Sequence, residues 1–238
     1  MNKYHPNMNE LYVFYAIPKT GGTTINKALI NKLNSDESFM LVNDKYSEYK
    51  LLSNEDKGKI KFIAGHRSSY QLINDNPGRE IKFITFFREP AKQIISHYNF
   101  QMNSKFEKPI SFKRWYYLHN LRNPQASHLM RRFRGDFLKS FLVTKKDTDA
   151  IKELLQSFYF VGVTEHIDMD APLIFKTFNI QKADLIRKKV AGQHYTIFEE
   201  LNNDLRMKLN KENKYDFDLY TFAQKLREDF YKSNSDMP

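Results

Sequence analysis

The residues with the clearest capacity for chemistry lie between Lys19 and Thr24, where the sequence reads KTGGTT. The two glycines allow a backbone to approach a ligand closely, and a lysine and three hydroxyls surround them. An apolar run, Leu11 to Ile17, precedes this segment, and apolar residues at helical spacing follow it from Ile25 to Leu33. A buried strand, a glycine loop and a helix N-terminus bring free N–H groups and the positive end of a helix dipole together. The stretch predicts an anion-binding loop; an ordinary capped turn is the alternative.

A second candidate is Arg88, which directly follows the strand-like run Ile81 to Phe87. A guanidinium binds a phosphate through two parallel hydrogen bonds, and Ser96 can reach the same anion if a helix begins at Pro90. ATP-dependent P-loop enzymes usually place a magnesium-binding aspartate at such a strand end, and this chain has an arginine there. An ion pair of Arg88 with a neighbouring glutamate is the structural alternative.

A third candidate is His66, which follows the strand-like run Ile60 to Ala64. Ligands of open α/β sheets collect beyond the carboxyl ends of the strands, so His66 is expected where the chemistry is done. An ordinary surface histidine is the alternative.

The order of residues in IPKTGGTTI differs from the Walker A pattern, in which the lysine follows the last glycine. It resembles the phosphosulfate-binding loop of sulfotransferases that use 3'-phosphoadenosine 5'-phosphosulfate (PAPS), and looks most like the carbohydrate 2-O and 6-O branch. Arg88-x-Pro90 followed by Ser96-x-Tyr98 resembles the 3'-phosphate-binding segment of that family. Glu89 stands where family members often have aspartate.

Later segments extend the resemblance over most of residues 11 to 222. Asn123-Pro124-Gln125 looks like the Asn-x-Gln region of the carbohydrate branch, and Phe160 to Glu165 resembles its Phe-x-Gly-x-Thr-Glu strand. The C-terminal pattern Asp216-x-x-Leu219-Tyr220 adds a third match. Core packing or a turn explains each of these later motifs equally well.

The resemblance implies sulfuryl transfer from PAPS to an acceptor hydroxyl, with release of the desulfated product PAP. It implies a 5'-phosphosulfate site made of Lys19, Thr20, Gly21, Gly22, Thr23 and Thr24. Arg88 and Ser96 would bind the 3'-phosphate, near Lys188 and Lys189 of a late basic loop. As catalytic residues, Lys19 would stabilise charge on the bridging oxygen and His66 would be the general base, with Glu89 as the fallback base.

The composition fits one domain spanning residues 1–238, although two small ones are possible. We expect a single P-loop-like α/β sulfotransferase domain with a mostly parallel central sheet flanked by helices. The net charge of +10 points to an anionic partner, which nucleic acid, acidic glycan or nucleotide would satisfy. We interpret the partner as a hydroxylated acceptor, a saccharide or polysaccharide, and not as nucleic acid.

The absence of cysteine excludes disulfides, thiolate zinc sites and thiol nucleophiles. Neither an apolar run of about 20 residues nor a signal-peptide core is present, whereas Golgi members of the resembled family carry an anchor. We therefore expect a cytoplasmic, bacterial enzyme, with a trimmed chain as the alternative. No HExxH, Cys/His or EF-hand spacing occurs, so we expect no metal.

The segment from 110 to 134 interleaves basic and aromatic residues and predicts an acceptor cleft. These residues are Lys113, Arg114, Trp115, Tyr116, Tyr117, Arg122, Arg131, Arg132 and Arg134. The same pattern fits nucleic acid, or a solvated helix face whose aromatic residues lie in the core.

Two other functions of the protein stay open: a P-loop kinase that uses magnesium ATP, and a non-catalytic module that binds polyanions.

The remaining elements follow from periodicity. We expect strands over Phe39–Val42 and Phe158–Val163, a polar connection over Asp44–Asn54, a basic loop over 181–196, and C-terminal helices over 197–212 and 216–231.

Overall fold

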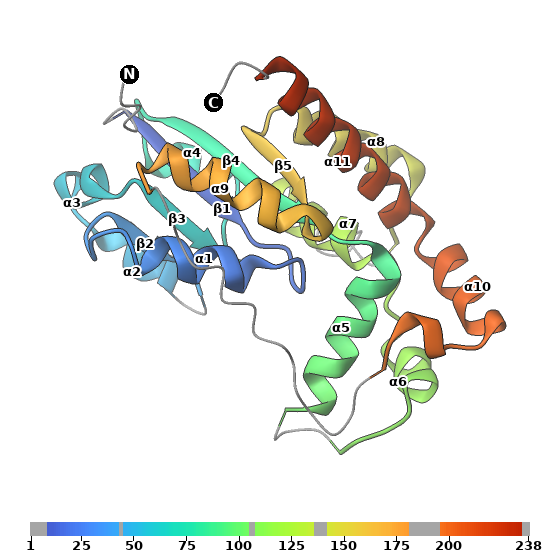
Figure 1. The fold of residues 1–238 in the computed structure, drawn as a ribbon. Coiled ribbons are helices and arrows are strands. Elements are labelled where there is room, and N and C mark those ends of the chain that lie inside the picture. Colours follow the sequence, from blue (N-terminus) through green and yellow to red (C-terminus); the bar gives the residue numbers. More distant parts are fainter. Residues whose placement is uncertain (1–8, 43–44, 105–107, 136–141, 181–195, 235–238) are drawn as a thin grey trace.

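The computed structural model describes residues 9–42, 45–104, 108–135, 142–180 and 196–234. A sheet of 5 strands runs through its centre in the order β2-β3-β1-β4-β5, and every neighbouring pair is parallel (Figure 1). The strands are β1 (Glu10–Tyr15), β2 (Ser38–Met40), β3 (Phe62–Gly65), β4 (Glu80–Phe87) and β5 (Phe160–Val163). The predicted α/β class, with a parallel sheet flanked by helices, is confirmed.

The helices are α1 (Gly22–Ile30), α2 (Lys45–Leu51), α3 (Asn54–Lys59), α4 (Gln71–Asp75), α5 (Pro90–Met102), α6 (Phe112–His119), α7 (Pro124–Leu129), α8 (Lys145–Gln156), α9 (Ile167–Thr177), α10 (Asn203–Glu212) and α11 (Lys214–Ser233). Shorter turns are the π-helical η1 (Met130–Arg134) and the 3₁₀ turns η3 (Thr164–His166) and η4 (Phe198–Glu200). Among the helices of the described ranges, none combines the length and apolar character needed to cross a bilayer.

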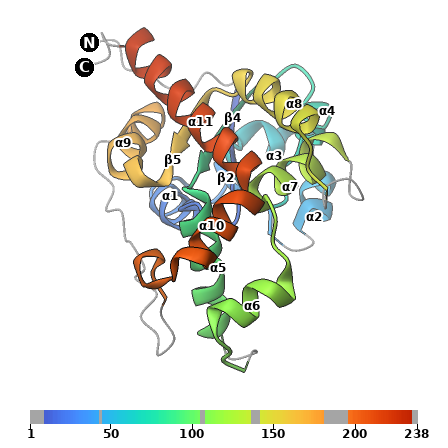
Figure 2. The ribbon, with the colours of Figure 1, turned by 90° about the vertical axis from the view of Figure 1, so that its right-hand side faces the viewer.

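Strand β1 is buried along its whole length because helices cover both faces of the sheet. Leu11, Val13 and Tyr15 face the side where α2, α4, α7, α8 and α11 pack, whereas Tyr12 and Phe14 face α1 and α9. Figure 2 shows α8 and α11 on one side of the sheet and α1 and α9 on the other. This two-sided burial explains why the sequence of β1 reads as a continuous apolar run.

A third apolar cluster joins α5, α6 and α10 beside the sheet. Trp115 of α6 is fully buried in it, together with Ile94 of α5 and Leu209 of α10. These helices project from the body of the molecule (Figure 1).

Two sequence-based expectations about the helices are wrong. The predicted polar connection Asp44–Asn54 contains α2, because Tyr49 is buried against Phe39 and its hydroxyl donates to Asn76 Oδ1 at 2.6 Å. The helix predicted over 197–212 is broken, because Asn202 caps a new helix by accepting from the Leu205 N–H. Most of the basic loop expected over 181–196 lies outside the described residues.

Strand β5 packs so closely on β4 that Gly162 has no room for a side chain. A Cβ at this position would lie 2.6 Å from Phe86 Cε1 and 2.9 Å from Phe160 Cε1. Gly58 in α3 has nothing within 4 Å of the corresponding position. The two glycines therefore differ in surroundings, and neither has positive φ.

We predict that Gly162→Ala lowers the free energy of unfolding by about 1–3 kcal/mol, because the added methyl group overpacks the core. The matched variant Gly58→Ala should raise it by about 0.5–1 kcal/mol, since alanine restricts the unfolded chain. Urea unfolding of both variants measures the difference. Equal effects of the two substitutions would contradict the packing at β5.

Candidate active site

The three predicted site segments lie at one edge of the sheet because β1, β3 and β4 are parallel neighbours. Tyr15 pairs with Gly65 on one side and Thr85 on the other, so the segments that follow these strands begin together. Arg88 Nη1 donates to the Lys19 carbonyl at 3.2 Å. The structure thus brings the glycine loop, His66 and Arg88 together.

The backbone that enters the glycine loop is fixed by side chains. The carbonyls of Ala16, Ile17, Pro18 and Lys19 bond in turn to His66 Nδ1 (2.5 Å), Thr20 Oγ1 (2.9 Å), Gln93 Nε2 (2.9 Å) and Arg88 Nη1 (3.2 Å). Side chains of the protein therefore satisfy these carbonyl oxygens. No sequence pattern singles out Gln93, because its partner Pro18 lies 75 residues away along the chain.

The helix that follows the loop begins without a side-chain cap. Gly21 is the N-cap residue of α1, with φ 88°, and within the described ranges no side chain caps the first turn. The first N–H groups of an α-helix have no intrahelical partner, so this end of α1 can bind an anion. Lys19 also has a left-handed backbone, with φ 68°, which costs a non-glycine residue about 1–2 kcal/mol.

The two glycines of the loop have different causes. Gly21 is required by its left-handed backbone, with φ 88°, whereas a Cβ on Gly22 would lie 3.1 Å from Ala16 Cβ and 3.3 Å from Phe14 Cε1. Thr20 is fully buried, and its hydroxyl holds the Ile17 carbonyl. Thr23 is exposed and Thr24 is partly exposed.

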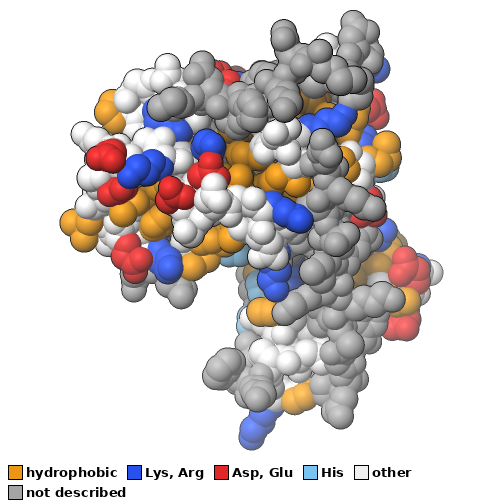
Figure 3. Space-filling model, turned by 60° about the vertical axis from the view of Figure 1, so that its left-hand side comes forward, with side chains coloured by type: hydrophobic (Ala, Val, Ile, Leu, Met, Phe, Trp, Pro, Cys, Tyr) orange, Lys and Arg blue, Asp and Glu red, His pale blue; other side chains and the backbone are white. Residues whose placement is uncertain are grey.

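The Lys19 ammonium lies 4.2 Å from the centre of the Phe100 ring on α5, a cation–π contact. Partial burial lowers the pKa of Lys19, and the nearby Arg88 charge lowers it further. Phe100 is 56% exposed, so this contact lies at the surface. Figure 3 shows the surface hollowed between the body of the molecule and the projecting helices, with basic and histidine side chains at the hollow.

His66 is exposed and has a defined tautomer. A carbonyl oxygen can only accept, so Nδ1 carries the proton in the bond to Ala16 and Nε2 is left as the acceptor. The ring of His128 lies 6.3 Å from that of His66. Burial lowers the pKa of His128 to about 3, so His128 is uncharged at neutral pH.

Gln125 of α7 fixes the backbone of Arg88. Its fully buried carboxamide accepts from the Arg88 N–H at 3.0 Å and donates to the Arg88 carbonyl at 2.8 Å. The oxygen and the nitrogen of the Gln125 carboxamide therefore both bind the Arg88 backbone. These two bonds restrain the position from which the Arg88 side chain extends.

Helices α7 and α11 cap each other and so hold Gln125. Asn123 Oδ1 accepts from the N–H groups of Tyr215 and Asp216 at 3.0 and 3.1 Å. In return, the carboxylate of Asp216 accepts from Gln125 at 2.9 Å and Ala126 at 2.8 Å. Burial raises the pKa of Asp216 to about 7, although these two N–H donors act in the opposite direction.

The remaining predicted site residues are Glu89, Ser96, Lys188 and Lys189. Glu89, the fallback base, caps α5 by accepting from Ala91 at 3.3 Å and Lys92 at 2.8 Å, so its carboxylate is already engaged. Ser96 lies half-buried on the same helix. Lys188 and Lys189 lie outside the described residues.

The basic and aromatic residues of 110–134 do not form one cleft. Trp115 and Tyr116 are buried in the core, whereas Arg122 pairs with Glu212 and Arg134 with Asp147, each at 3.5 Å. The expected acceptor cleft is wrong for Trp115 and Tyr116, because these two residues stabilise the packing of α6, whereas Tyr117 is exposed.

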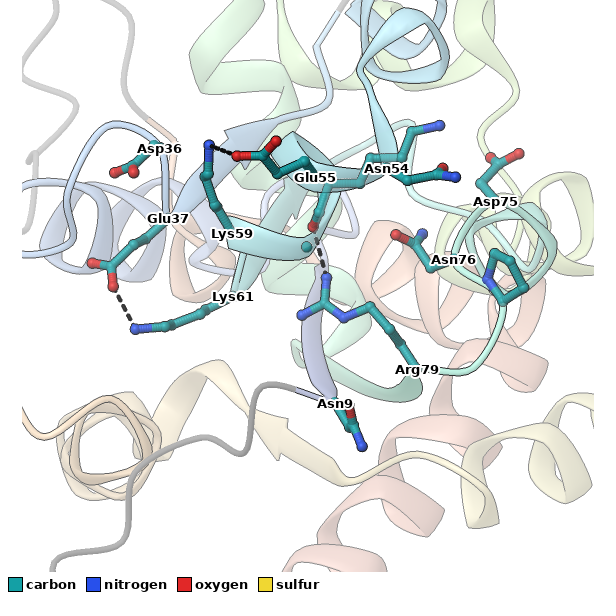
Figure 4. A pocket seen from close by; sticks show the side chains of 13 residues that line it. Asn9, Asp36, Glu37, Asn54, Glu55, Lys59, Lys61, Asp75, Asn76 and Arg79 are labelled. Atoms are coloured by element: carbon teal, nitrogen blue, oxygen red, sulfur yellow. Dashed lines mark hydrogen bonds and ion pairs between the residues drawn. The ribbon is translucent and has the colours of Figure 1, made fainter.

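A cavity of about 760 Å³ lies at the amino ends of the strands, and residues 19–24 are not among those that line it. Figure 4 shows its lining side chains. Its charged side chains bond within the protein: Lys59 to Glu55 at 3.1 Å, and Arg79 to the Lys57 carbonyl at 2.9 Å. These internal pairs explain its polarity, so we assign no function to it. Within the described ranges, no group of three or more His, Asp or Glu side chains is positioned to hold a metal ion.

No protein-family model matches the chain. The chain is similar to a protein-tyrosine sulfotransferase of Arabidopsis thaliana, with 30% identity over 103 residues, which are 43% of this chain. The match covers 19% of that relative, so the chain corresponds to less than a fifth of its length. This partial similarity supports the resemblance to sulfotransferases and suggests a transferase, without reaching the carbohydrate branch.

Proposed function

We propose that the protein transfers a sulfuryl group from PAPS to a hydroxyl of a carbohydrate or related acceptor and releases PAP. The observation that carries the proposal is the convergence of three groups at one sheet edge: the uncapped end of α1, Arg88 and His66. An uncapped helix end and a guanidinium suit a ligand with two separate anionic groups. PAPS has such groups, a 5'-phosphosulfate and a 3'-phosphate.

In this proposal the loop from Lys19 to Thr24 and the first N–H groups of α1 bind the 5'-phosphosulfate. Arg88 and Ser96 bind the 3'-phosphate, with Lys188 and Lys189 near it. Lys19 moves from the Phe100 ring to the bridging oxygen, where negative charge grows as the sulfur–oxygen bond breaks.

His66 is the general base. Its Nε2 takes the proton of the acceptor hydroxyl while the hydroxyl oxygen bonds to sulfur and the bridging oxygen leaves with PAP. The bond from Nδ1 to the Ala16 carbonyl fixes the ring in the tautomer that this step needs. Glu89 is the weaker candidate because its carboxylate caps α5.

The acceptor named for the Arabidopsis relative is a protein tyrosine, and a phenolic hydroxyl is a second candidate for this chain.

Magnesium dependence of activity distinguishes the kinase alternative. Polymer binding that survives loss of the nucleotide site distinguishes the non-catalytic module.

The first test is isothermal calorimetry with PAP in EDTA, with ADP as the control. We expect micromolar PAP binding and much weaker ADP binding. Arg88→Ala should weaken PAP binding about tenfold or more, because it removes a charged hydrogen bond worth about 1.5–3 kcal/mol. Adenosine 5'-phosphosulfate, which lacks the 3'-phosphate, should lose much less affinity than PAP, and the loss that remains reports the bond from Arg88 to the Lys19 carbonyl. No PAP binding, or binding of ATP only with magnesium, would contradict the proposal.

We predict that His66→Ala lowers turnover by about 10²–10⁴-fold, the usual contribution of a general base, and leaves PAP affinity unchanged. Single-turnover kinetics with saturating PAPS measure the effect. Normal turnover in this variant would remove His66 from the mechanism.

We predict that Gln125→Leu weakens PAP binding about tenfold with little effect on adenosine 5'-phosphosulfate, because Arg88 loses both backbone restraints. Gln71→Leu, at an exposed residue of α4, is the matched control. A general folding defect would weaken both ligands equally, so unequal losses distinguish positioning from stability.

A further inference from the structure

A cavity of about 260 Å³ opens between α1 and the carboxyl ends of β2 and β3. His66 and Thr23 lie exposed on its rim, so it borders both the candidate base and the anion-binding loop. The buried lining residues are Ala16, Gly22, Asn26 and Gly65. The half-buried walls are Ile30, Met40 and Val42.

Asn26 is the buried polar side chain of this cavity. It is 7% exposed, and its Oδ1 has no hydrogen-bond partner in the part of the chain that the structure describes. Few buried polar groups stay unpaired in native structures, because each lost partner is costly. A ligand that fills the cavity can supply the missing partner.

The lining restricts what that ligand is. A carboxamide turned about its Cβ–Cγ bond presents either its nitrogen or its oxygen, and a hydroxyl pairs with both because it donates and accepts. Among the described lining residues Lys27 is the one lysine or arginine, and it is exposed. A carboxylate or sulfate beside the buried Asn26 would have no buried counterion among these residues, which is strongly unfavourable.

The size of the cavity limits the ligand to one ring. Sites for drug-sized ligands usually measure about 300–1,000 Å³, so 260 Å³ holds a smaller group. Apolar walls with few polar groups fit the C–H face of a sugar ring, whose hydroxyls lie at its edge.

We propose that this cavity is the acceptor subsite and takes one uncharged sugar ring. The sugar ring presents its reacting hydroxyl to His66 Nε2, and Asn26 forms a hydrogen bond with the neighbouring hydroxyl. This inference rests on the proposed function, since it places the acceptor beside the proposed base. Anionic groups of the acceptor lie outside the cavity.

The test is calorimetry on the PAP-loaded protein, with cellotetraose, maltotetraose and chitotetraose as neutral probes and tetragalacturonate as the acidic probe. We expect a neutral probe to bind the wild type and to bind Asn26→Leu about tenfold more weakly. Asn54→Leu, an exposed asparagine at the opposite end of the sheet, should leave that affinity unchanged.

Val42→Trp, which fills the cavity from a half-buried wall, is a second variant in case Asn26→Leu does not fold. It should abolish binding of the neutral probe and leave PAP affinity intact. Three outcomes would overturn the inference. The wild type binds tetragalacturonate more tightly than the neutral probes, or Asn26→Leu binds a neutral probe as tightly as the wild type does, or the wild type binds no neutral probe. Failure of the wild type to bind PAP would contradict the proposed function instead.

Discussion

The candidate site depends on how the protein satisfies the carbonyl oxygens of residues 16–19. A loop that meets an anion must direct its N–H groups toward the ligand, and its carbonyls then need partners elsewhere. Here His66, Thr20, Gln93 and Arg88 provide the partners. Three of these side chains come from other elements, so the loop is complete only when β3, β4 and α5 are in place.

Arg88 links this loop to the far end of the chain. Its guanidinium holds the Lys19 carbonyl, its backbone is held by Gln125, and α7 is held by Asp216 of α11. The two bonds that Asp216 accepts are buried, and those of Arg88 are part-buried, so Asp216 restrains Arg88 through the position of Gln125. The resemblance of the Asn-x-Gln and Asp216 motifs to sulfotransferases thus has a physical explanation in reciprocal helix capping.

The sequence predicted the parts of the site that local patterns encode. The apolar run of β1, the glycine loop, and Arg88 at a strand end were visible, because each depends on neighbours in the chain. Gln93 and Asn26 were missed, and Gln125 was noted only as part of a motif without its contact to Arg88. A polar residue in a helix gives no sign that its partner is distant or absent. The predicted basic and aromatic cleft failed for a related reason, since composition does not distinguish a core tryptophan from an exposed one.

The position of His66 joins the two halves of the site. On one side, Lys19, Arg88 and the end of α1 provide positive charge; on the other, the cavity beside Asn26 is lined by apolar walls. His66 borders both the loop and the cavity. Its Nδ1 donates a hydrogen bond to the carbonyl of Ala16, the first residue of the backbone that enters the loop. In the proposed function, one backbone segment places both the donor and the base, and such an arrangement needs little reorganisation for group transfer. This placement follows from the register of β1 with β3, because pairing of Tyr15 with Gly65 brings the start of the loop beside the segment that carries His66.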